Sequence, residues 1–94
     1  APAGDEDWFR FRLNGIGNPQ IHLTSLPANY DLYVYDAEGH LLGSSTKGGK
    51  AAELVVVSRA LPGDYYARVV GVNSASDERN PYQLRFNVPG TGGP

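Results

Sequence analysis

The sequence predicts an all-β domain, an antiparallel β-sandwich of jelly-roll-like type. Three observations support this prediction. Several short segments alternate strictly between apolar and polar residues, which is the period of a half-buried strand. Twelve glycines and seven prolines in 94 residues supply frequent turn signals. No segment shows a capped stripe with a helical period, and about seven short strands separated by turns are typical of a two-sheet sandwich.

The first two strands are predicted at residues 8–13 and 20–24. In the first, Trp8, Arg10 and Arg12 alternate with three apolar side chains expected in the core: Phe9, Phe11 and Leu13. The second strand turns Ile21 and Leu23 inward and leaves His22 outward.

A β-hairpin is predicted over residues 29–45. Leu32 and Val34 alternate with Tyr33 and Tyr35, so one face of the strand is apolar and the other carries tyrosines. Aspartate at position 36 and glycine three residues later suit a type I turn that closes a short hairpin loop. Residues 41 and 42, both leucine, lead the returning strand.

Three more strands are predicted in the second half of the chain. Residues 53–58 form a nearly continuous apolar run, which fits a strand covered on both faces or lying under another element. Residues 65–72 and 82–88 alternate again. The complete predicted core is Phe9, Phe11, Leu13, Ile21, Leu23, Leu32, Val34, Leu54, Val56, Tyr65, Val69, Leu84 and Phe86.

Length and composition exclude several classes of protein. We expect one domain over residues 1–94, with linker-like ends at 1–4 and 89–94 that indicate a domain within a longer protein. The absence of cysteine excludes disulfides and thiolate metal sites. A net charge of −2 with mixed signs lacks the basic surface of a nucleic-acid-binding protein. No apolar run approaches the roughly 20 residues of a membrane-spanning helix.

Catalytic signals are absent from the sequence, and we predict that the domain is not an enzyme. A nucleophile needs a base within hydrogen-bond reach and a group that orients this base. The two histidines, His22 and His40, lie on an outward strand position and just after a turn, and no Gly-x-Ser-x-Gly motif is present. We therefore expect both to be exposed and to take part in no reaction.

The acidic residues before the first strand suggest a calcium site. Asp5 and Asp7 could supply part of it, with Asp31 from the start of the hairpin. Calcium takes six to eight oxygen ligands, with several carboxylates converging. The alternative is that these acids cap turns and protect an edge strand from aggregation.

Aromatic and arginine side chains outside the core stripe suggest a ligand-binding surface. Tyr33, Tyr35, Tyr66 and Arg68 are the candidate residues, because tyrosine and arginine are frequent anchors of recognition surfaces. The alternative is that they stabilise the sheet as cross-strand pairs without a ligand. For Trp8 we expect partly buried packing.

Four motifs in order resemble the bacterial pre-peptidase C-terminal domain family. They are Asp-x-Asp-Trp-Phe at 5–9, Asp-Leu-Tyr-Val-Tyr-Asp-x-x-Gly at 31–39, Pro-Gly-x-Tyr-Tyr-x-x-Val at 62–69 and Pro-Tyr-x-Leu at 81–84. The resemblance covers nearly the whole chain. It implies a jelly-roll-like sandwich without catalytic activity, attached to secreted proteases and other exported hydrolases. Related collagen-binding domains bind calcium and fibrous collagen, with outward tyrosines at the ligand, and Tyr66 resembles such a position.

These observations lead to one functional expectation and two alternatives. We expect a non-catalytic C-terminal accessory domain of a secreted or cell-surface bacterial hydrolase, a peptidase first of all, that assists secretion, folding or stability. Its partner would then be the catalytic domain of the same chain. The alternatives are a targeting module for an insoluble polymer such as collagen or polysaccharide, and a structural spacer of a surface protein. Calcium is the one candidate cofactor.

Overall fold

The computed structural model describes residues 6–24, 30–47, 52–71 and 83–88, which form seven strands. Their bounds are β1 Glu6–Leu13, β2 Gln20–Thr24, β3 Tyr30–Asp36, β4 Leu41–Ser45, β5 Glu53–Val56, β6 Gly63–Gly71 and β7 Gln83–Asn87. In these described ranges no helix is long and apolar enough to cross a membrane.

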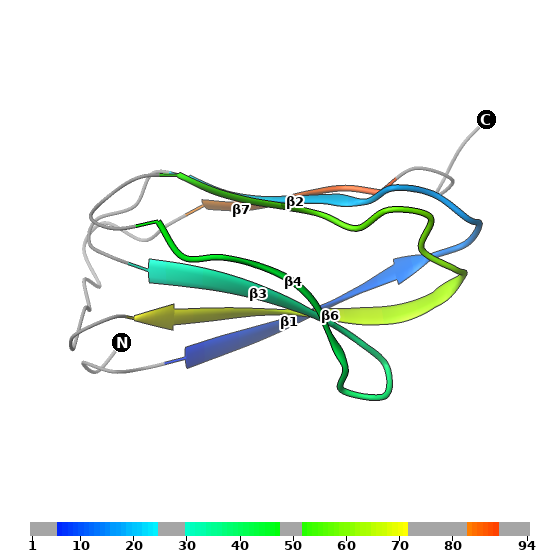
Figure 1. The fold of residues 1–94 in the computed structure, drawn as a ribbon, viewed down its shortest axis with the longest axis horizontal. Coiled ribbons are helices and arrows are strands. Elements are labelled where there is room, and N and C mark those ends of the chain that lie inside the picture. Colours follow the sequence, from blue (N-terminus) through cyan, green and yellow to red (C-terminus); the bar gives the residue numbers. More distant parts are fainter. Residues whose placement is uncertain (1–5, 25–29, 48–51, 72–82, 89–94) are drawn as a thin grey trace.

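The strands form two antiparallel sheets that pack face to face (Figure 1). One sheet has the order β1-β6-β3-β4 and the other the order β5-β2-β7. Only the step from β3 to β4 stays within a sheet, and every other step between consecutive strands crosses to the opposite layer. Such crossing is typical of jelly-roll-like sandwiches, so the predicted fold class is confirmed.

A single core fills the space between the sheets. The four-stranded sheet contributes Leu13, Leu32 and Val69, and the other sheet contributes Ile21 and Leu23, all fully or almost fully buried. Phe9, Leu84, Phe86 and Val88 are partly buried and pack against this core. Phe11 contacts the rings of Tyr65 and Phe86, with centroid separations of 5.6 and 5.0 Å. Most of the predicted core is therefore confirmed.

The prediction was wrong for β5, where the orientation is inverted. Leu54 and Val56 are 45% and 46% exposed, whereas Glu53, Val55 and Val57 are buried. The reason lies in the pairing with β2: Val55 lies opposite the inward-facing Ile21. Since β5 is at the edge of its sheet and covered on one face only, alternate residues of an unbroken apolar run must face solvent.

The β3–β4 hairpin has the turn that the sequence predicts. The amide of Gly39 donates to the carbonyl of Asp36 over 3.1 Å, and the amide of Asp36 donates to the carbonyl of His40 over 3.0 Å. Gly39 has a φ of 87°, a left-handed conformation in which a Cβ atom would be strained. A register shift follows, so that Val34 lies opposite Gly43 but Tyr35 lies opposite Leu41.

Candidate functional site

The antiparallel register brings the four predicted ligand-binding residues together on the outer face of the four-stranded sheet. Arg68 on β6 lies opposite Trp8 on β1 and opposite Tyr33 on β3. In the neighbouring row Tyr66 lies opposite Tyr35. Cross-strand neighbours on one face of a sheet are close enough for their side chains to interact. We use the term aromatic face for the set Glu6, Trp8, Tyr33, Tyr35, Tyr66 and Arg68.

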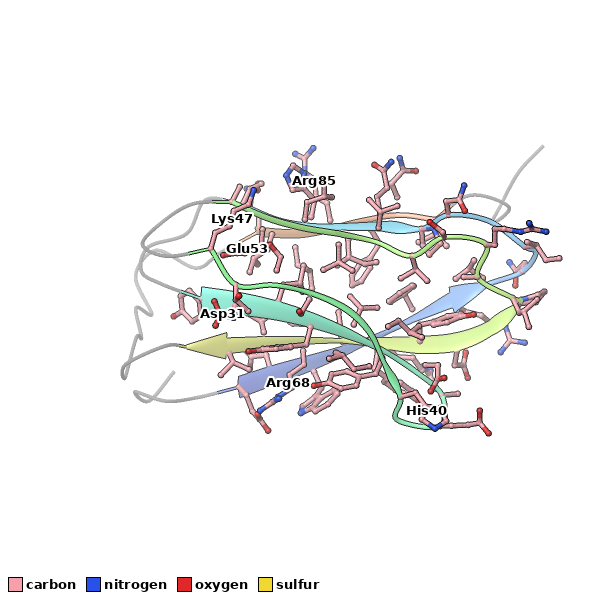
Figure 2. All side chains as sticks on the ribbon, viewed as in Figure 1. Asp31, His40, Lys47, Glu53, Arg68 and Arg85 are labelled. Atoms are coloured by element: carbon pink, nitrogen blue, oxygen red, sulfur yellow. The ribbon has the colours of Figure 1, made fainter. Side chains whose placement is uncertain are left out.

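Arg68 is the centre of the aromatic face (Figure 2). Its Nε and Nη2 atoms lie 2.7 and 2.6 Å from Oε2 of Glu6, and its Nη1 donates to the hydroxyl of Tyr35 over 3.3 Å. The guanidinium carbon lies 5.7 Å from the ring centroid of Trp8 and 5.5 Å from that of Tyr33, within cation–π range. One arginine therefore links β1, β3 and β6.

Trp8 completes this cluster but remains accessible. Its indole Nε1 donates to Oε1 of Glu6 over 3.4 Å, and its ring lies 5.3 Å from that of Tyr35 at an interplanar angle of 38°. The residue is nevertheless 52% exposed, more than we expected for a packing residue. The aromatic face thus offers about half of an indole surface to solvent.

The charges of the aromatic face largely compensate each other. The hydrogen bond from Arg68, with a smaller contribution from Trp8, lowers the pKa of Glu6 below its usual value. The pKa of Arg68 is raised by its hydrogen bond to Tyr35 and by that to Glu6. Both side chains are therefore charged at neutral pH. A ligand would meet an arginine whose charge already has a partner within the domain.

Sequence reasoning missed Glu6 as the partner of Arg68. Alternation alone puts Glu6 on the same side of its strand as Trp8. The pairing of β1 with β6 joins residues about 60 positions apart, and no local pattern encodes this pairing.

Of the three predicted calcium ligands, the structure describes Asp7 and Asp31, and these two do not lie together. Asp5 lies outside the described residues. Asp7 lies opposite Val69 and Asp31 opposite Val70, so β6 separates the two aspartates and their side chains belong to opposite faces of the sheet. The pKa of Asp31 is raised, first by burial and then by the negative charge of Glu53.

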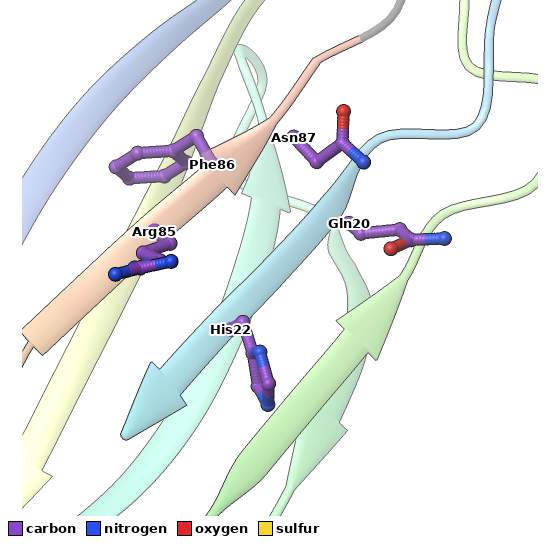
Figure 3. A pocket seen from close by; sticks show the side chains of 5 residues that line it. All are labelled: Gln20, His22, Arg85, Phe86 and Asn87. Carbon is purple, nitrogen blue, oxygen red and sulfur yellow. The ribbon is translucent and has the colours of Figure 1, made fainter. Parts of the chain in front are cut away.

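The opposite side of the molecule carries a shallow pocket on the outer face of the three-stranded sheet. Its volume is about 290 Å³. His22 lies opposite Arg85, and Gln20 lies opposite Asn87, as Figure 3 shows for these strands. Phe86 also lines the pocket. None of the five lining side chains carries a hydroxyl or thiol that could act as a nucleophile beside His22.

Comparison with known proteins identifies the family of this chain. The family model of the bacterial pre-peptidase C-terminal domain matches residues 5–71, well over half of the chain. The matched region contains β1 to β6 and the whole aromatic face. No curated protein matches the chain. The chain therefore belongs to the bacterial pre-peptidase C-terminal domain family, a family of accessory domains.

Proposed function

We propose that this domain is a non-catalytic accessory module of an exported bacterial hydrolase, a peptidase in the first instance. Its role would be to support the folding, stability or secretion of the catalytic domain in the same chain. Family membership supports the accessory role. The observation that carries the proposal is the contact set of Arg68: the one cation at the centre of the aromatic face is held by Glu6, Tyr35, Trp8 and Tyr33.

This contact set favours a stabilising role over ligand capture. A recognition arginine is most effective when its donors are free to form a bidentate pair with the ligand. In this domain the guanidinium instead joins three neighbouring strands, and two of its nitrogens bind the same carboxylate. Breaking these contacts to bind a ligand would sacrifice interactions that hold the sheet together.

Deletion of residues 5–88 from the full-length protein that carries the domain tests this proposal. We expect less folded enzyme in the exported fraction or a lower melting temperature. The kcat/KM of the purified remainder on a small soluble substrate should stay the same. A fall in kcat/KM at an unchanged yield and melting temperature would contradict the proposal and assign the domain a part in the reaction. An unchanged yield, melting temperature and kcat/KM would favour a spacer.

A second candidate function is the targeting of an insoluble polymer, favoured by the exposure of Trp8. A flat indole beside Tyr33 and Tyr35 offers a surface on which a sugar ring or a fibrous protein could pack. Tyr66, in the neighbouring row, would extend this surface.

Co-sedimentation of the 94-residue chain with insoluble collagen, chitin and cellulose distinguishes the two functions. Targeting predicts retention on one polymer and its loss in Trp8→Ala and Tyr66→Ala. Leu54→Ala is the matched control, because Leu54 is exposed on the other sheet. The targeting function is wrong if none of the polymers retains the wild type. It is also wrong if Leu54→Ala loses retention to the same extent as Trp8→Ala and Tyr66→Ala.

A further inference from the structure

The tip of the β3–β4 hairpin gathers three side chains of the types that can bind metals: Asp36, Glu38 and His40. Within the described parts of the chain, their ligand atoms all lie within 4.8 Å of one another. Nδ1 of His40 lies 3.1 Å from Oδ2 of Asp36 and 4.0 Å from Oε1 of Glu38. We propose that this hairpin tip is a binding site for a divalent first-row transition metal such as Zn²⁺.

The backbone of the turn holds one of the three ligand side chains, that of Asp36, in place. Oδ1 of Asp36 accepts hydrogen bonds from the amides of Glu38 and His40, each over 2.9 Å. These bonds fix the carboxylate and leave its second oxygen, Oδ2, directed at the imidazole. The left-handed Gly39 between the ligands lets the chain reverse within this span. The imidazole of His40 is positioned by Oδ2 of Asp36, so binding has to exchange this contact for the metal and to order Glu38.

The spacing of the ligand atoms suits a transition metal. Such ions bind carboxylate oxygen and imidazole nitrogen at about 2.0–2.2 Å, so two ligands of a tetrahedral ion lie roughly 3.4 Å apart. The observed separation of 3.1 Å between Nδ1 and Oδ2 is a hydrogen-bond distance that has to widen only slightly to admit an ion. Glu38 is 81% exposed, so its carboxylate can rotate the remaining distance toward the ion. Water would occupy the other positions, because the tip projects from the sandwich (Figure 2).

The ligand types indicate which ions the site would select. Imidazole suits Zn²⁺, Cu²⁺ and Ni²⁺, whereas Ca²⁺ and Mg²⁺ take oxygen ligands. A site with one imidazole and two carboxylates therefore favours Zn²⁺ over Ca²⁺. This site shares no residue with the aromatic face or with the calcium ligands predicted from the sequence, and it stands independently of the proposed function.

The simpler explanation of this cluster is an ion pair or hydrogen bond between His40 and Asp36 without a metal. The two explanations differ in their response to zinc. A metal site predicts saturable binding that involves all three side chains, whereas a pair of His40 and Asp36 alone predicts no saturable change at residues 36–40.

Zinc titration of the tag-free 94-residue chain, followed by two-dimensional NMR and by calorimetry, tests the proposal. We expect saturable shifts centred on residues 36–40 at neutral pH. Removal of a direct ligand in His40→Ala should weaken zinc binding at least about tenfold, since even residues that only support metal ligands have effects of this size. Glu38→Gln should also weaken it and leaves the backbone bonds of the turn intact.

His22→Ala is the matched control, because this histidine is exposed on the opposite sheet and should leave zinc binding unchanged. A parallel Ca²⁺ titration should produce no saturable change at residues 36–40. The proposal is overturned if zinc shifts centre on His22, if His40→Ala and Glu38→Gln bind zinc as the wild type does, or if no saturable change occurs.

Discussion

At the scale of single residues, the buried Glu53 places the strictest demand on its surroundings. This polar side chain is completely buried and faces the interior of the sandwich. Oε1 accepts hydrogen bonds from the hydroxyl of Ser45 and from the amide of Lys47. Oε2 has no hydrogen-bond partner among the described residues. A buried polar group with few partners makes each remaining hydrogen bond more important.

Ser45→Ala should therefore destabilise the domain by about 1 to 3 kcal/mol, the typical effect of leaving a buried acceptor without its donor. The reason is that the hydroxyl of Ser45 donates a hydrogen bond to Glu53 and also accepts one from the amide of Leu54 over 3.4 Å. Urea denaturation would measure the change. Ser44→Ala is the control, because the neighbouring serine is exposed and should change stability by less than about 0.5 kcal/mol. Equal effects of the two substitutions would contradict the role of Ser45.

The pair of Glu6 and Arg68 should make stability depend on pH. The pKa of Glu6 is lower in the folded state than its usual value of 4.5, so ionised Glu6 stabilises the folded state above pH 4.5. This stabilisation disappears as the pH falls through the folded-state pKa. Asp36, whose pKa is also lowered, likewise loses its stabilising effect on acidification. Asp31, whose pKa is raised, has the opposite effect, because its protonation on acidification favours the folded state.

Glu6→Gln should consequently be less stable than the wild type at pH 7 and approach it on acidification. Melting temperatures of both proteins between pH 7 and pH 3 would check this expectation. A difference that stays constant across this range would show that the charge of Glu6 is not the cause.

At the scale of elements, β5 shows how pairing decides the orientation of an apolar strand. Val55 is buried opposite Ile21, and its neighbour Val56 is exposed. Val55→Ala should destabilise the domain by about 2 kcal/mol through lost burial and the cavity that remains. Val56→Ala should change stability by less than about 0.5 kcal/mol. Chemical denaturation of both variants would compare them. A larger loss of stability in Val56→Ala than in Val55→Ala would support the orientation predicted from the sequence.

The close approach of β4 and β5 gives a second prediction at this scale. A Cβ atom on Gly43 would lie 2.8 Å from Cγ1 of Val55, too close for both side chains to remain in place. Gly43→Ala should therefore destabilise the domain by about 1 to 3 kcal/mol through overpacking. In a Val55→Ala background the same substitution should have a smaller effect, because the clashing methyl group is gone. Additive effects in this double-mutant cycle would show that the two residues do not interact.

At the scale of the whole molecule, the two sheets depend on each other because they share one core. Neither sheet buries its inner face without the other. We therefore expect a single cooperative unfolding transition. The fluorescence of Trp8 reports on the four-stranded sheet, and far-UV circular dichroism reports on both sheets. Their urea midpoints should coincide, whereas separate midpoints would mean that one sheet unfolds alone.

The sequence was sufficient to predict strand faces and turns wherever the interactions that determine them are local. Alternation predicted the inward faces of β1, β2, β3 and β6, because successive side chains of any strand point to opposite faces. The turn after Asp36 followed from its residue types, since glycine adopts the left-handed conformation without strain. For β5 the same approach failed, because a continuous apolar run contains no alternation to interpret.

By itself, the sequence determined the fold class, most of the core, the hairpin turn and the family to which this chain belongs. Only the tertiary structure decided which distant residues meet. It joined Arg68 to Glu6 and Trp8, separated Asp7 from Asp31, and buried Glu53 beside Ser45. The physical reason is that strand pairing depends on the fit of whole faces in a shared core, whereas alternation and turn preference depend only on neighbouring residues.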